Sequence, residues 1–194
     1  MNTYLLLPFV EIEIRLGTMS KNFDSCIDRK YFYQICGTLE QGNWNLIENK
    51  NTSEYINQNL KLINSESIIL KENVLTKTLQ LKNSPFDIRF SVNQEFSLDS
   101  YVNSFSKENA VIRNKSRKSF ISDHFRYDLT VVSEIINGIT REKHEIEIEL
   151  LVTPETLVWT SEYINDFLEC KIYDLINIVE PIEREKFKID IKTQ

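Results

Sequence analysis

The sequence predicts a mainly β fold of the α+β class, a closed antiparallel β-barrel of about eight strands with helices packed on its outside. Three observations predict it: several segments alternate charged and apolar residues, the charges within most of them share one sign, and a long amphipathic helix lies near the C-terminus. Because successive side chains of a strand point to opposite faces, each segment would have a charged face and an apolar face.

Two of these segments are acidic. In residues 10–16 and again in residues 143–152, glutamates alternate with isoleucine or leucine, and Gly17 is expected to end the first strand. The acids of the two segments are Glu11, Glu13, Glu145, Glu147 and Glu149. Like charges that face one small space repel unless cations or protons neutralise them, so the two strands indicate a metal site.

The chain between the acidic strands reads as one helix followed by strands. Asp28 is a suitable N-cap, apolar residues at helical spacing follow it, and Gly42 lies just past the predicted helix end. Asn137-Gly138 predicts a hairpin turn before the last strand. The other predicted strands cover residues 44–49, 54–63, 67–70, 75–81, 86–96, 110–120 and 125–133.

A long helix is expected near the C-terminus. Thr153 is the predicted N-cap, and Pro154 suits the first helical position. Apolar residues then recur at helical spacing from Leu157 to Val179, and Pro181 is expected to end the helix. We expect its apolar stripe to cover one outer face of the sheet.

Other strands carry basic residues on their charged face. Taken singly, such a strand would be the solvated side of an open sheet. Ordinary surfaces mix both signs, however, so strands sorted by charge favour a closed sheet with the charged faces turned inward. The polar faces hold Arg113, Lys115, Arg117 and Ser119 in one strand, Arg126, Asp128 and Thr130 in the next, and Arg89, Ser91, Asn93 and Glu95 in an earlier one.

Composition bounds the possible functions. The 194 residues, 41% hydrophobic and 27% charged, fit one domain spanning residues 1–194, and the net charge of −6 argues against binding nucleic acid through bulk charge. No apolar stretch is long enough for a membrane span, so no membrane partner is expected.

The three cysteines, without paired spacing, predict free thiols in a reducing, intracellular compartment. The two histidines lack any catalytic motif, and four glycines leave no phosphate loop.

Four motifs resemble, in their order along the chain, the triphosphate tunnel metalloenzymes. They are most similar to the metal-dependent RNA triphosphatases of fungal, protozoan and large-DNA-virus mRNA capping systems. The motifs are Glu-Ile-Glu-Ile-Arg-Leu-Gly at 11–17, Arg-Asn-Lys-Ser-Arg at 113–117, Arg-Tyr-Asp-Leu-Thr at 126–130 and Glu-Ile-Glu-Ile-Glu at 145–149. The resemblance runs from Glu11 to Leu150 and suits the predicted barrel.

The resemblance also implies a larger context. Abundant Ile, Asn and Lys beside a lone alanine, Ala110, favour an AT-rich genome. With the motifs, this favours the N-terminal triphosphatase domain of a giant-virus capping enzyme, located in the host cytoplasm or the virion. Guanylyltransferase and methyltransferase domains would then follow on the same polypeptide.

The resemblance implies roles for the acidic residues. Glu11, Glu13 and Glu149 would bind Mg²⁺ or Mn²⁺, hard cations that prefer carboxylate oxygen. Glu145 and Glu147 would hold water molecules around the metal, and one such water would be the nucleophile.

The basic residues match the phosphate-binding side of the family's tunnel. Lys115, Arg117 and Arg126 correspond best, and Arg113 and Arg89 are further candidates. Lys77 matches another basic family position, although by strand parity it shares a face with leucines. Arg15 has the parity to face inward. The residues expected to support the basic side chains are Glu95, Asp128 and Thr130.

The implied reaction removes the γ-phosphate from 5′-triphosphate RNA, the first step of mRNA capping, with nucleoside triphosphates as side substrates. One alternative is a tunnel enzyme that acts on tripolyphosphate, a nucleotide or thiamine triphosphate. Those relatives usually read Glu-x-Glu-x-Lys, and Arg15 at the fifth position favours the capping branch. Another alternative is a non-catalytic anion-binding barrel, against which five clustered carboxylates argue.

Overall fold

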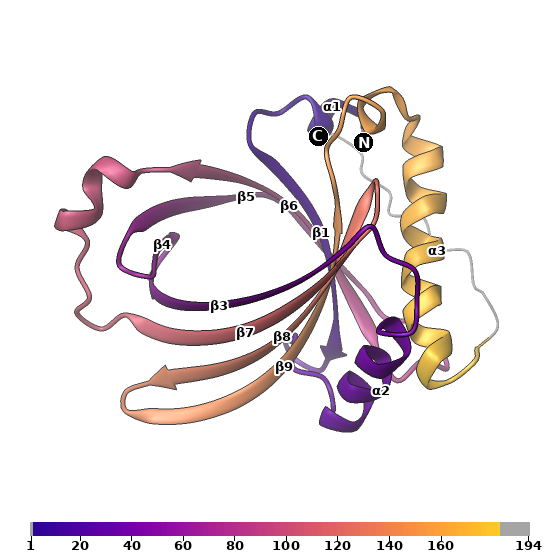
Figure 1. Ribbon diagram of the computed structural model, residues 1–194, viewed down its shortest axis with the longest axis horizontal. Helices are drawn as coiled ribbons and strands as arrows, with labels where there is room; N and C mark the ends of the chain where they lie inside the picture. The colour runs from indigo at the N-terminus through magenta and orange to yellow at the C-terminus, as the bar shows by residue number, and fades with distance from the viewer. Residues whose placement is uncertain (1, 183–194) are drawn as a thin grey trace.

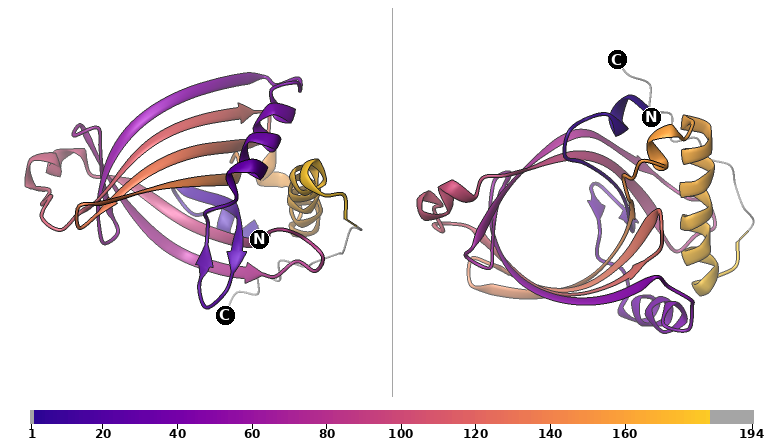
Figure 2. Two further views of the ribbon diagram at one scale, coloured as in Figure 1. Left: turned by 90° about the horizontal axis from the view of Figure 1, so that it is seen from below. Right: turned by 45° about the horizontal axis from the view of Figure 1, so that its top comes forward.

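The structure, a computed structural model, describes residues 2–182. Eight strands form an antiparallel sheet in the order β1–β6–β5–β4–β3–β7–β8–β9, which closes because β1 also pairs with β9. Figure 2 (right) shows the strands as a ring. The strands are β1 (Val10–Met19), β3 (Leu46–Asn57), β4 (Leu60–Ile63), β5 (Ser67–Leu79), β6 (Asp87–Ser97), β7 (Val111–Ile121), β8 (Phe125–Ile136) and β9 (Ile139–Leu150). The predicted eight-stranded barrel is confirmed.

The hydrophobic core lies outside the ring. Helices α2 (Arg29–Leu39) and α3 (Ser161–Val179) pack on the same side of the barrel (Figure 1). Their Ile35 and Ile172 are fully buried, as are Ile14 of β1 and Ile148 of β9. Burying these apolar faces stabilises the fold. Because side chains alternate along a strand, the opposite faces of the same strands then point into the barrel interior.

The helix predictions are confirmed in part. Asp28 caps α2 by accepting a hydrogen bond from the Lys30 backbone N–H at 2.7 Å, and α3 covers an outer face as expected. The predicted start of α3 is wrong, because its N-cap is Thr160 and not Thr153. Thr156 is the cause: its buried hydroxyl bonds to the Leu151 carbonyl and to the Thr153 backbone, and η2 (Thr156–Val158) forms instead.

Besides η2, two short helices within residues 2–182 were not predicted. They are α1 (Asn2–Leu5) and the 3₁₀ helix η1 (Asp99–Ser104), which lies on the side of the barrel opposite α3 (Figure 1). None of the helices within residues 2–182 is long and apolar enough to span a membrane.

Several strand boundaries differ from the predictions. Strand β1 continues past Gly17, where the missing side chain lets β2 (Phe23–Asp24) pair at close range. Predicted strands 67–70 and 75–81 are one strand, β5, with a bulge between Asn73 and Leu75. The predicted turn at Asn137-Gly138 is confirmed, and both residues have positive φ.

Candidate active site

The charged faces of the strands meet inside the barrel. They enclose a cavity of about 210 Å³, the inner cavity, where acids and bases alternate around one small space. Its charged lining residues are Glu11, Glu13, Arg15, Lys50, Glu54, Lys61, Lys71, Glu95, Lys115, Arg117, Arg126 and Glu147. An interior this polar suits a charged ligand rather than an apolar one.

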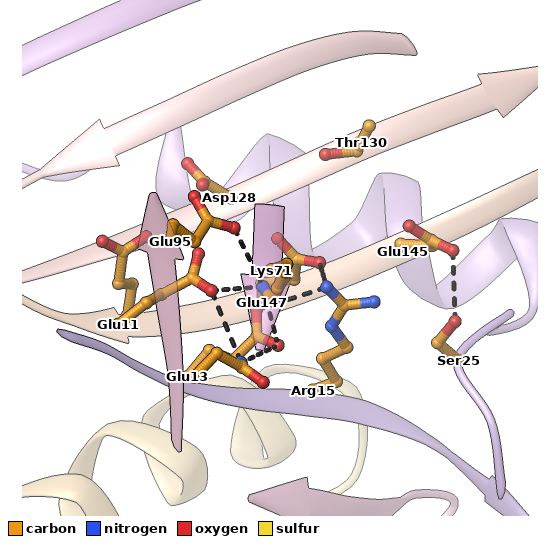
Figure 3. Close-up of polar contacts among 12 residues, drawn as sticks. Glu11, Glu13, Arg15, Ser25, Lys71, Glu95, Asp128, Thr130, Glu145 and Glu147 are labelled. Atoms are coloured by element: carbon orange, nitrogen blue, oxygen red, sulfur yellow. Dashed lines mark hydrogen bonds and ion pairs between the residues drawn. The ribbon is translucent and has the colours of Figure 1, made fainter. Parts of the chain in front are cut away.

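Three acids meet where β1 begins and β9 ends. Glu13 lies directly opposite Glu149 in the β1–β9 register, and Glu11 is the preceding inward position. Lys71 of β5 forms ion pairs with Glu11 and, at 3.6 Å, with Glu13 (Figure 3). The Asn93 side-chain amide donates to Glu13 at 3.3 Å. The ammonium group of Lys71 therefore partly neutralises this acidic corner.

The pKa values of two of these acids show that charge compensation is incomplete. Burial and the neighbouring Glu13 raise the pKa of Glu11, although Lys71 opposes them. Burial raises the pKa of Glu149 to about 8 against the attraction of Arg126, and Glu11 adds to the rise. A further cation would stabilise the ionised form of both groups.

Glu147 lies between two arginines. Its Oε1 is 2.7 Å from Arg15 and its Oε2 is 3.0 Å from Arg117. Burial would raise the pKa of Glu147, but Arg15 and Arg117 hold it well below the usual value. Glu147 is thus an ionised acceptor that fixes the positions of two cations.

The basic side of the cavity is organised around Asp128. The Asp128 carboxylate accepts hydrogen bonds from Ser119 at 2.5 Å, Arg117 at 2.7 Å and Arg126 at 3.0 Å. Arg117 also donates to the Thr130 hydroxyl at 3.0 Å. These bonds orient both guanidinium groups on the lumen side of β7 and β8.

A second cavity of about 320 Å³, the outer cavity, adjoins the first. Arg89 and Arg113 line it but not the inner cavity. Arg113 pairs with Glu145 at 2.6 Å. Ser25 donates a hydrogen bond to the same carboxylate at 3.1 Å, as Figure 3 shows. The barrel interior therefore holds two neighbouring cavities with different arginines.

Comparison with known proteins identifies the family. The family model described as mRNA capping enzyme, beta chain, matches residues 21–160, well over half of the chain. The chain belongs to this RNA triphosphatase family. Among curated proteins, no significant match is found.

Two solved structures of RNA triphosphatases share the fold. The S. pombe Pct1 RNA triphosphatase superposes with a TM-score of 0.68 at 18% identity, covering 90% of this chain and 88% of that chain. The Mimivirus capping enzyme triphosphatase gives a TM-score of 0.60 at 19% identity and covers 92% of each chain. The fold of these two RNA triphosphatases is thus the closed barrel described above.

Apart from Lys77, each predicted site residue lines one of the two cavities or bonds to a residue that does. Lys77 does not, because in the β5–β6 register it lies opposite Phe90, on the face that packs toward the outer core. The cause is the bulge at Val74, which reverses the inward parity of β5 along its length.

Sequence reasoning missed four charged residues of the inner cavity, which the structure places beside the predicted ones. Lys71 fell between two predicted strands, although its position two residues after Ile69 continues one alternating face. Glu54 pairs with Lys115 at 2.7 Å. The four missed residues are Lys50, Glu54, Lys61 and Lys71.

The donor set fits the divalent cation on which this family depends. Within residues 2–182 no three histidine, cysteine or carboxylate side chains are grouped tightly enough to form a metal site. Burial raises the pKa of Glu11 and of Glu149, so a bound cation would favour their ionised forms, and carboxylate oxygen is the ligand that Mg²⁺ and Mn²⁺ prefer. Glu11, Glu13 and Glu149 are the residues that could hold the ion.

Proposed function

We propose that the protein hydrolyses the γ-phosphate of 5′-triphosphate RNA, leaving a diphosphate end and inorganic phosphate, the first step of mRNA capping. The single observation that carries this proposal is an enclosed cavity in which oriented arginines and lysines face clustered carboxylates. Transfer of a phosphoryl group needs positioning and neutralisation of charge more than covalent help from the protein.

The basic residues bind the triphosphate in this proposal. Arg117 and Arg126 are already oriented by Asp128 and offer paired N–H donors to phosphate oxygens. Burial lowers the pKa of Lys115, although Glu54 opposes the shift, so an incoming phosphate would favour its charged form. Lys71 and Arg113 add further positive charge.

The acidic residues would hold the cation and position the basic side chains. Glu11, Glu13 and Glu149 bind Mg²⁺ or Mn²⁺, which when bound supplies neutralising charge at the γ-phosphate. Glu147 keeps Arg117 in place, and Glu145 keeps Arg113 in place. Glu95 pairs with Lys71 at 3.3 Å and limits its movement.

Two finer parts of the proposal rest on sequence. A giant-virus source rests on the composition, and further capping domains on the parent polypeptide rest on the family resemblance. Nucleoside triphosphates should be side substrates, because the proposed contacts are to the triphosphate and not to the base.

The test is release of phosphate from RNA labelled at its terminal phosphate, with Mg²⁺, Mn²⁺ and a chelator compared. We expect metal-dependent release, and replacing Glu11, Glu13 or Glu149 with Gln should reduce it at least about a hundredfold. Glu40→Gln is the matched control, because Glu40 pairs with Lys118 on the outer surface. Full turnover in two of the three tunnel variants would refute the site.

A further inference from the structure

Arg89 is an inward-facing cation without a carboxylate partner. Within residues 2–182 no carboxylate lies within ion-pair distance of it, and its Nε is buried without a hydrogen-bond acceptor. Arg15, Arg113, Arg117 and Arg126 all form ion pairs inside the barrel. The Nε atoms of Arg15 and Arg113 are also buried without an acceptor, but carboxylates pair with those two guanidinium groups, so Arg89 is set apart by its missing carboxylate partner.

The position of Arg89 is fixed by an aromatic ring. Its guanidinium carbon lies 4.8 Å from the centroid of Phe23, which β2 carries to the end of the barrel. The ring can lie there only because residue 17 is a glycine, where a Cβ would come within 2.6 Å of Phe23. Stacking on the ring orients the guanidinium and leaves its N–H groups available to an anion.

The two cavities are neighbours that share part of their lining. The inner cavity alone is lined by Glu11, Arg117 and Arg126, and the outer cavity alone by Arg89 and Arg113. The residues that line both are Glu13, Arg15, Lys61, Lys71 and Lys115. A ligand held in the inner cavity can therefore extend past Arg89.

Charge changes sign along this path. On three adjoining strands the inward residues change from acid to base in the same direction, from Glu149 to Lys143 on β9, from Glu11 to Arg15 on β1, and from Glu95 to Arg89 on β6. Acids of both ends have ion-pair partners: Glu134 pairs with Lys143 at 2.8 Å at the basic end, Glu95 pairs with Lys71 at 3.3 Å at the other, and Glu149 there pairs with Arg126. What distinguishes the basic end is Arg89, which within residues 2–182 has no carboxylate partner and so leaves positive charge for a polyanionic chain.

We propose that Arg89 binds the first phosphodiester of the RNA, with the γ-phosphate in the inner cavity and the RNA chain leaving through the outer cavity past Phe23. This direction of the RNA through the barrel, which we call its polarity, rests on the proposed function. Arg89 lies opposite Arg15, two inward positions or about 13 Å along β1 from Glu11, which is farther than a triphosphate group spans. Arg89 would then distinguish RNA from shorter polyphosphates.

Steady-state kinetics on two substrates test the role of Arg89. For Arg89→Ala we expect the KM for triphosphate-ended RNA to rise about tenfold, the loss of one charge-assisted hydrogen bond, and the KM for tripolyphosphate to rise less than about threefold. Arg89→Lys should recover part of the loss, because it keeps the charge. Equal changes for the two substrates, or no change for RNA, would overturn the proposal.

Lys50 provides a matched control at the other end of the path. It is an exposed lysine that lines the inner cavity but not the outer one. Lys50→Ala should leave the ratio of the two KM values unchanged. A shift of that ratio with Lys50→Ala but not with Arg89→Ala would reverse the proposed polarity.

A crosslinking experiment separates this inference from the proposed function. Triphosphate-ended RNA with 4-thiouridine at its second and third nucleotides should crosslink on irradiation to residues 20–28, which include Phe23. Crosslinks confined to residues 46–51 would refute the polarity. Wild-type protein that crosslinks at residues 20–28 but releases no phosphate would refute the proposed function and leave the polarity standing.

Discussion

Asp128 determines how two arginines of the tunnel are held. Its side chain is 1% exposed and accepts hydrogen bonds from Ser119, Arg117 and Arg126. A carboxylate this buried is stable only because several donors satisfy it. Strand parity predicted that Asp128 would lie beside arginines. The cross-strand bond from Arg117 depends on the β7–β8 register, which the sequence pattern does not specify.

Removing this carboxylate should affect both stability and binding. We expect Asp128→Ala to lower the free energy of unfolding by about 3 kcal/mol, because two partly buried guanidinium groups lose a shared acceptor. The KM for triphosphate-ended RNA should rise as well, since Arg117 and Arg126 lose their orientation. Urea denaturation and steady-state kinetics measure the two effects.

Lys118→Ala is the control for the stability effect. Lys118 pairs with Glu40 on the outer surface, where both side chains are at least 30% exposed. An exposed pair contributes at most about 1 kcal/mol. Equal losses of stability in Asp128→Ala and Lys118→Ala would contradict a structural role for the buried carboxylate.

At the scale of elements, the strand patterns predicted most of the barrel. Alternation identified the strands and their inward faces, and Asn137-Gly138 identified the last hairpin. The bulge in β5 could not be predicted, because it arises from pairing with β6 and not from local sequence. The irregularity divided β5 into two predicted strands and so hid Lys71. Lys77 was placed in the site by the family resemblance alone, and its shared face with leucines already indicated the outer side.

The pairing of β2 with β1 requires a glycine at position 17. Replacing Gly17 and, for comparison, Gly37 with alanine tests this requirement. Gly17→Ala should destabilise the protein by about 1–3 kcal/mol, since its Cβ would lie 2.2 Å from the Asp24 carbonyl oxygen. Gly37→Ala in α2 should stabilise it by about 0.5–1 kcal/mol, because a Cβ there meets nothing within 4 Å. Denaturation midpoints measure both changes, and a shift of the same sign in the two variants would contradict this account.

The whole molecule has a well-covered side and an exposed side. The outer faces of β1, β6, β8 and β9 are buried beneath α2 and α3, as Figure 1 shows for the helices. Residues 46–51 of β3 are exposed on both faces, and the register pairs residues 46–53 with β7 only. The sequence predicted a covering helix, but not which strands it covers, because several strands have apolar faces of similar composition.

This asymmetry predicts how backbone amides exchange with solvent. Amides of residues 46–53 should exchange faster than those of β1 and β9, because local opening of β3 breaks one row of strand pairing and uncovers little apolar surface. Hydrogen–deuterium exchange followed by mass spectrometry measures both sets in one sample.

A non-hydrolysable triphosphate with Mg²⁺ should slow exchange in β3 and β7, because the ligand would link Lys115 and Arg117 to the acidic strands across the cavity. Uniform exchange in β1 and β3 without ligand would contradict the asymmetry, and protection limited to β1 and β9 would contradict binding between the two sides.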